Sequence, residues 1–146
     1  MVQLKVKEIQ AIGLSGFFVE QTFRAKFGFD FYSGQFTEDG QSNRVGKKFG
    51  AAVQLIGPVE NLTNLGLIVP MSLDDPLSTI RAKKFLQTFF SFFPGADNGP
   101  TWVEGNIYEA TTNGSGLTIR HNDLTIELNG IPTSNGLVFT LMVSKG

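Results

Sequence analysis

The chain has 146 residues, a length that fits a single domain, residues 1–146, with one hydrophobic core. Apolar residues make up 41% and charged residues 17%, which excludes an intrinsically disordered chain, because such chains are rich in charge and poor in large apolar groups. The formal net charge of −1 excludes a strongly basic nucleic-acid protein, although the first fifty residues hold a small excess of basic side chains.

The sequence contains no cysteine, so disulfides and thiolate metal sites are impossible. Lysines are spaced through residues 1–10 instead of preceding an apolar run, which differs from the pattern of a signal peptide. The densest apolar stretch, residues 85–93, is far too short to span a bilayer. We therefore expect a cytoplasmic or virion protein that is not secreted through a signal peptide and does not bind membranes.

Residues 17–32 alternate between apolar and polar side chains. The odd positions are Phe17, Val19, Gln21, Phe23, Ala25, Phe27, Phe29 and Phe31. A period of two predicts one long strand with a buried face and a wet face. Gly28 lies on the wet face, where it predicts a bend or bulge that lets the strand curve.

A polar loop follows, and two further strands are predicted at residues 47–56 and 65–73. Asp74-Asp75-Pro76 has the pattern of a helix start, since a carboxylate caps the first amides and proline fits the first turn. We expect this helix to run over residues 76–93 and to end at Pro94-Gly95.

Asn-Gly dipeptides punctuate the last third of the chain, at residues 98–99, 113–114, 129–130 and 135–136. This dipeptide tolerates the positive φ of tight hairpin turns and therefore indicates an antiparallel meander. The predicted strands are residues 102–111, 116–121, 124–129 and 137–144.

The expected fold class is mostly β (α+β), a small antiparallel barrel or sandwich with one helix. Its element order, β-β-β-α-β-β-(β-β), is similar to that of the OB-fold barrel, in which a long curved first strand precedes a helix between strands three and four. Another small barrel or sandwich with one packed helix is the alternative.

Chemistry-bearing residues are few. His121 is the only histidine, and its polar neighbours predict an ordinary solvated turn. The carboxylate pairs Glu38-Asp39 and Asp74-Asp75 fall in a loop and at a helix start, where neither is buried enough for general acid catalysis. No phosphate-binding glycine pattern occurs. We predict no enzyme activity, no cofactor and no metal.

Basic and aromatic side chains gather in the first third of the chain. Bases of a single strand stack on aromatic rings while lysine and arginine contact the phosphates. If two adjacent strands share one face, the candidate nucleic-acid-binding residues are Phe18, Arg24, Lys26, Tyr32, Arg44, Lys47, Lys48 and Phe49. The alternative interpretation is a solvated strand face with scattered charge.

The second half of the predicted helix is apolar almost all round, so every side of it has to be covered. A second copy of the chain or the following meander would each provide that cover. On the first interpretation the oligomer interface contains Phe89, Phe90, Phe92 and Phe93.

Residues 51–75, a strand, a glycine turn, a returning strand and an acidic helix start, are similar to a segment of the 6-pyruvoyl-tetrahydropterin synthase family. Thr22-Phe23-Arg24-Ala25 also resembles that family's first strand. The resemblance implies a zinc site of three histidines and a cysteine nucleophile, which this sequence lacks. We therefore treat it as a similarity of turn pattern and assign no family.

Three functions remain open. The first is single-stranded nucleic-acid binding by an oligomeric OB-like barrel. The second is a self-assembling structural subunit, such as a virion or tail-type component. The third is a barrel whose odd-face phenylalanines line a cavity for a small apolar ligand.

Overall fold

The computed structural model describes residues 10–114 and 116–146. The helices in this part of the chain are α1 (Gly16–Phe27), α2 (Pro76–Ser91) and α3 (Gly99–Asn113). The strands are β1 (Asp30–Ser33), β2 (Asn43–Lys48), β3 (Ala51–Ile56), β4 (Asn64–Ser72), β5 (Leu117–His121), β6 (Leu124–Thr133) and β7 (Gly136–Lys145).

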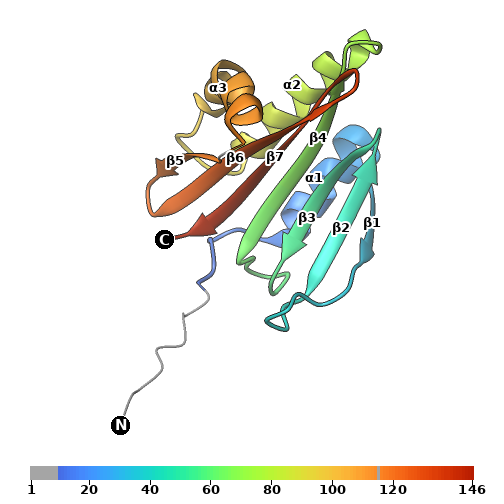
Figure 1. Ribbon diagram of the computed structural model, residues 1–146. Helices are drawn as coiled ribbons and strands as arrows, with labels where there is room; N and C mark the ends of the chain where they lie inside the picture. Colours follow the sequence, from blue (N-terminus) through green and yellow to red (C-terminus); the bar gives the residue numbers. More distant parts are fainter. Residues whose placement is uncertain (1–9, 115) are drawn as a thin grey trace.

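The strands form one antiparallel sheet in the order β1-β2-β3-β4-β7-β6-β5 (Figure 1). The predicted α+β class with an antiparallel sheet is confirmed. The barrel and the OB-like arrangement are not confirmed, because the sheet is open, with β1 at one edge and β5 at the other. The middle strand is β4, which joins the first four strands to the last three through its pairing with β7.

The three helices pack on the same face of the sheet. Leu55, Leu65 and Val143 are cross-strand neighbours on one face of the sheet, and Arg44 pairs with Leu55 on that face. The Arg44 guanidinium donates a hydrogen bond to Glu20, which places α1 on the same face. On the same face, Gly130 of β6 lies against Thr111 of α3, so that an added Cβ would be 2.2 Å from the threonine hydroxyl. We call this the covered face, and the opposite one the uncovered face.

The core lies between the helices and the covered face. Alternate strand residues point into it, as period two requires. The strands contribute Val53, Leu55, Leu65, Leu67, Val69, Leu124, Ile126, Leu128, Phe139, Leu141 and Val143, all less than a tenth exposed. Phenylalanine rings from α1, β1 and α2 fill the space above β1 to β4, and the rings of Phe27 and Phe85 meet edge to face with centroids 4.8 Å apart.

The long strand predicted at residues 17–32 is wrong, because residues 16–27 form α1. Val19, Phe23 and Phe27 are spaced by four residues and therefore share one side of a helix as well as one side of a strand. The caps favour the helix: the Ser15 hydroxyl accepts a hydrogen bond from the Phe18 amide, and Gly28 ends the helix with φ +73°. Gly28 is thus a helix cap and not a strand bulge.

The strand predicted at residues 102–111 is also wrong. Two Asn-Gly dipeptides bound α3 instead of marking hairpins, since Asn98 precedes its first turn and Gly114 ends it with φ +64°. Glycine at positive φ serves a helix C-terminus as well as a hairpin. Val103 and Ile107, spaced by four residues, are buried against the sheet.

The other predicted elements are close to those observed. The helix predicted at 76–93 is α2, and the later strands match β4, β5, β6 and β7 within a few residues. The strand predicted at 47–56 is instead the end of β2 and all of β3. Phe49 and Gly50, both at positive φ (+55° and +75°), form the two-residue turn between them.

Phe49 is an unfavourable residue for this turn, because left-handed backbone brings Cβ of a bulky residue close to the next carbonyl oxygen. Asparagine tolerates that conformation, so we expect Phe49→Asn to be more stable than Phe49→Ala by about 1 kcal/mol. Urea unfolding of the two variants measures the difference. Both lack the ring and its contacts, so equal stabilities would mean that the backbone at residue 49 is not strained.

Candidate functional site

Two of the predicted nucleic-acid residues, Arg24 and Arg44, lie together on either side of Glu20. Nη2 of Arg44 is 2.7 Å and Nη2 of Arg24 is 2.9 Å from Oε1 of Glu20. Arg44 also donates from Nε to the other carboxylate oxygen, at 3.1 Å. This Glu20 cluster ties α1 to β2 across the covered face, so the two guanidinium groups serve the fold.

Burial alone would raise the pKa of the Glu20 carboxyl, but hydrogen bonds from Arg44 and then Arg24 outweigh it and lower the pKa below its ordinary value. The carboxylate therefore stays ionised wherever the protein is folded at neutral pH. A phosphate would have to compete with it for the same two arginines.

The lowered pKa makes stability depend on pH. Glu20 takes up a proton more readily in the unfolded chain, where its pKa is near 4.5, than in the folded one. Its contribution is present above that pH and is lost as the pH falls through the folded pKa. We expect urea unfolding to show that stability decreases more steeply below pH 4.5 for the unmodified protein than for Glu20→Gln.

Asp39 and Asp75 also have lowered pKa values, through hydrogen bonds from Thr37 and Arg81 respectively. Protonation of these two carboxylates destabilises the unmodified protein and Glu20→Gln equally in the same acidic range. Only the difference between the pH dependences of stability of the two proteins therefore reports on Glu20. Parallel slopes would show that the Glu20 cluster does not stabilise the folded state.

The other predicted nucleic-acid residues are divided between the two faces of the sheet. Nζ of Lys47 lies 5.7 Å from the ring centroid of Tyr32, and this pair is on the uncovered face. At the β2–β3 turn, two cations lie over the Phe49 ring. Nζ of Lys48 is 5.4 Å and Cζ of Arg81 is 5.0 Å from the ring centroid.

Phe18 and Lys26 belong to α1, on the covered side. The Phe18 ring packs edge to face on Phe92, with centroids 5.6 Å apart, although the side chain is more than half exposed. Lys26 is exposed in the last turn of the helix. The single strand face predicted to hold all eight residues is therefore not formed.

The four phenylalanines predicted as an oligomer interface, Phe89, Phe90, Phe92 and Phe93, are 0 to 7% exposed within one chain. The ring centroids of Phe23 and Phe92 lie 6.2 Å apart with the rings tilted by 37°, and Phe89 contacts the rings of Phe90 and Phe93. Residues of the same chain, including Phe18 and Phe23 of α1, cover the apolar end of α2, whereas the alternative interpretation had expected the following meander to do so. These positions are core and not surface.

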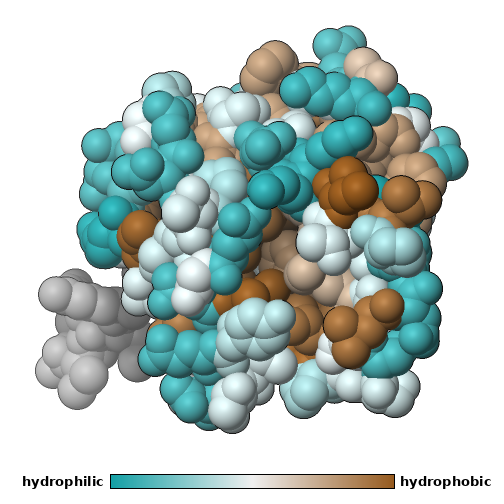
Figure 2. Space-filling view, turned by 90° about the horizontal axis from the view of Figure 1, so that it is seen from above, coloured by the Kyte–Doolittle hydropathy of each residue, from teal (hydrophilic) through white to brown (hydrophobic). Residues whose placement is uncertain are grey.

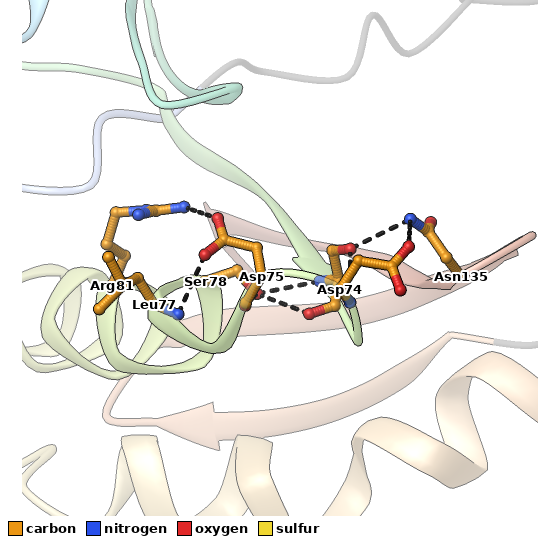
Figure 3. Close-up of polar contacts among 7 residues, drawn as sticks. Asp74, Asp75, Leu77, Ser78, Arg81 and Asn135 are labelled. Carbon is orange, nitrogen blue, oxygen red and sulfur yellow. Dashed lines mark hydrogen bonds and ion pairs between the residues drawn. The ribbon is translucent and has the colours of Figure 1, made fainter.

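The acidic pair before α2 caps the helix, as predicted, and also joins it to a distant hairpin (Figure 3). Asp75 accepts a hydrogen bond from the Leu77 amide at 3.0 Å and pairs with Arg81. Asp74 accepts one at 2.9 Å from Asn135, in the β6–β7 turn. Arg81 therefore connects the cap of α2 to the Phe49 ring.

The uncovered face is the part of the molecule whose side chains the described fold leaves without a packing layer. The three middle strands, β3, β4 and β7, carry no charged side chain on it. Their residues on this face are Ala52, Gln54, Ile56, Asn64, Gly66, Ile68, Pro70, Ser72, Gly136, Val138, Thr140, Met142 and Ser144. Ile68, on the central strand, is 37% exposed.

None of the predicted site residues lies on this face of β3, β4 and β7, although the sequence contains a signal for it. A half-buried antiparallel strand usually alternates apolar and polar residues, with charges on the wet side. In β4 the residues between Leu65, Leu67 and Val69 are glycine and isoleucine, with asparagine and proline beyond them. We interpret an uncharged wet side over three adjacent strands as a candidate binding surface.

Further apolar side chains are exposed at the end of the molecule where β4 leads into α2. Leu73 is 88% exposed, Leu77 58% and Ile131, near the β6–β7 turn, 60%. The space-filling view of this end shows separate apolar side chains among polar ones (Figure 2). Ile131 pairs with Val138 and therefore lies on the uncovered face.

His121 ends β5 beside the Asn122–Asp123 turn, as predicted, and its Nε2 lies 2.8 Å from the Pro94 carbonyl oxygen. Among residues 10–114 and 116–146, no three His, Asp or Glu side chains are grouped as a metal site would require. Within the same residues, no helix combines the length and apolar character needed to cross a membrane. Comparison with protein-family models, curated proteins and solved structures finds no match to this chain.

Proposed function

We propose that this protein is a non-catalytic subunit that associates with a second copy of itself through the uncovered face. The observation that carries the proposal is the absence of charge on this face of β3, β4 and β7, the three middle strands of the sheet. A face of this kind is self-compatible, because no like charges meet when it packs against its own copy. Two such sheets pack about 10 Å apart, with their side chains interdigitated.

In the strands that the structure describes, the charged side chains on this face lie toward the two edges of the sheet. Asp30 and Lys47 are on β1 and β2, and Arg120 and Glu127 are on β5 and β6. If the two-fold axis runs parallel to β4, midway between the two sheets, the strand order of one copy is reversed over the other. The β1–β2 margin of one copy then lies over the β5–β6 margin of its partner. Each margin carries one acid and one base, so opposite charges can face each other at both ends of the contact.

The face is large enough for a stable dimer. Seven strands about 4.8 Å apart, with about seven residues each at 3.3 Å, cover roughly 800 Å² per copy. Specific interfaces bury about 800 Å² per partner. The charged margins and the uncharged centre also match the usual depletion of charged residues at the core of an interface relative to its polar rim.

Sedimentation over a concentration series tests this proposal. We expect a dimer that Ile68→Lys dissociates, because a two-fold contact brings two lysines together at its centre. Like charges placed opposite each other cost several kcal/mol, which corresponds to a dissociation constant raised by at least about 100-fold. Gln87→Lys, on the exposed side of α2, adds the same charge away from the face and should leave the dimer intact.

A protein that stays monomeric at high concentration, or a dimer that tolerates Ile68→Lys, would contradict the proposal. An isologous contact closes at two copies. Rings or longer polymers would therefore require another contact, such as an exposed sheet edge, and would support the virion or tail-type role. Both outcomes are visible in the same sedimentation experiment.

Single-stranded nucleic-acid binding is a second candidate, supported by cations placed over exposed rings. Tyr32 is 45% and Phe49 52% exposed, and Lys47, Lys48 and Arg81 lie beside them. Bases stack on such rings at about 1–3 kcal/mol each.

Fluorescence anisotropy with a labelled oligonucleotide across a salt series tests this second candidate. Binding should weaken as salt rises, and Lys47→Glu should weaken it further, whereas Lys84→Glu on α2 should change it little. No binding at low salt, or binding that is insensitive to salt, would remove this candidate.

A further inference from the structure

A cleft lies between α2 and α3 on the covered side of the sheet, away from the uncovered face. Its volume is about 280 Å³. Pairs spaced by four residues line it from each helix: Ala82 and Leu86 from α2, and Val103 and Ile107 from α3. Phe139 of β7 forms part of the floor, so the walls and base are apolar.

The volume defines the size of the occupant. An apolar cavity of about 150 Å³ holds benzene, and sites for drug-sized compounds begin at about 300 Å³. The cleft therefore fits a compound of two or three small rings. Ala82 has the smallest side chain among the lining residues and is 2% exposed. A larger side chain at this position would fill part of the cleft.

The rim of the cleft carries balanced charge. Nζ of Lys83 is 3.9 Å from Oε1 of Glu104, and the two side chains come from opposite helices. The attraction of an anionic ligand to Lys83 is offset by its repulsion from Glu104, so a negative charge does not increase the affinity. An uncharged ligand loses no hydration of an ionic group when it enters an apolar site.

Tyr108 lies at the mouth with its side chain 76% exposed, an unusual state for a large aromatic residue next to an apolar cleft. Its ring would bury apolar area by closing over an occupant, which stabilises a complex by about 25 cal/mol per Å². Thr79, also at the mouth, provides a hydroxyl for a polar substituent of the ligand.

From these features we propose that the cleft between α2 and α3 is a binding site for a small, uncharged, apolar compound with two or three rings. The site does not depend on self-association, because it lies on the other side of the sheet. It also differs from the barrel cavity predicted from the sequence, since Phe23 and Phe29 are buried in the core and do not line it.

Two dyes with the same ring skeleton provide the test. N-phenyl-1-naphthylamine is uncharged, and 8-anilinonaphthalene-1-sulfonate carries an added sulfonate. We expect the uncharged dye to bind saturably at one site per chain and to quench Trp102, the only tryptophan, which precedes the lining residue Val103. The sulfonate should bind at least about tenfold more weakly, because entry strips the ion of water.

Variants locate the dye. Ala82→Met fills the cleft and should weaken binding at least tenfold, whereas Ala25→Met adds the same atoms to the exposed side of α1 and should have no effect. Thr79→Phe obstructs the mouth at an exposed position, so it remains informative if Ala82→Met does not fold. Thermal unfolding of each variant without dye checks that it is folded.

Absence of saturable binding up to the solubility limit of the uncharged dye would overturn the proposal. Binding that survives both Ala82→Met and Thr79→Phe would also overturn it, because the dye would then occupy another part of the molecule. Ile68→Lys should bind the dye as the unmodified protein does. Loss of binding in Ile68→Lys alone would place the dye at the uncovered face and would likewise overturn the cleft as the site.

Discussion

Replacing Phe89 with alanine is expected to destabilise the monomer by about 3–5 kcal/mol, because a large aromatic side chain leaves a cavity in a packed core. Phe89 is fully buried and contacts the rings of Phe90 and Phe93. Such a loss is comparable with the whole stability of many domains, which is about 5–15 kcal/mol. Urea unfolding followed by circular dichroism measures it.

Phe18→Ala is the matched control, since it removes the same side chain from a position that is 57% exposed. Its expected cost is about 1 kcal/mol, for the one edge-to-face contact with Phe92. If Phe89→Ala kept its monomer stability and instead dissociated an oligomer, the apolar end of α2 would be an interface after all, and its burial within one chain would be wrong.

Gly136→Ala is expected to cost about 3 kcal/mol, at the upper end for overpacking, because the obstacle is backbone and not a movable side chain. A Cβ at this position would lie 1.9 Å from the Met71 carbonyl oxygen. Glycine here lets the ends of β4 and β7 approach, where the Leu73 amide donates to the Asn135 carbonyl at 2.7 Å. The alanine must separate the strands and weaken that bond.

Gly105→Ala is the control, with an effect of opposite sign. Gly105 is exposed within α3, and an added Cβ there would meet nothing within 4 Å. Alanine in a helix interior is favoured over glycine by up to about 1 kcal/mol. Thermal unfolding should therefore rank Gly105→Ala above the unmodified protein and Gly136→Ala well below it. Equal melting temperatures for the two variants would contradict the packing described for Gly136.

The sequence predicts those elements whose local signals agree. At α2, the Asp75 cap, the following proline and the apolar pattern all point to one helix, and the strands β4 to β7 have clear alternation. At α1 the signals conflict, because a phenylalanine-rich segment satisfies a period of two and a spacing of four together. The caps at Ser15 and Gly28 decide for the helix.

The candidate site was harder to predict, because it depends on which residues share a face across strands distant in sequence. Arg24 and Arg44 come together from a helix and a strand, not on the predicted face of two adjacent strands, and Glu20 lies between them and neutralises part of their charge. The uncovered face exists only through the pairing of β4 with β7, a choice that no local pattern specifies. The alternation within a strand shows which residues share a side, but the tertiary fold determines which side the helices leave uncovered.

The pairing of β4 with β7 also governs how fast the protein can fold. Every other strand pair in the sheet joins neighbours in sequence, whereas the partners in β4 and β7 are 64 to 78 residues apart. Closing so long a loop costs chain entropy before the contact forms, and such non-local pairings slow folding. We therefore expect the two halves of the sheet to form first, and the joining of β4 to β7 to set the folding rate.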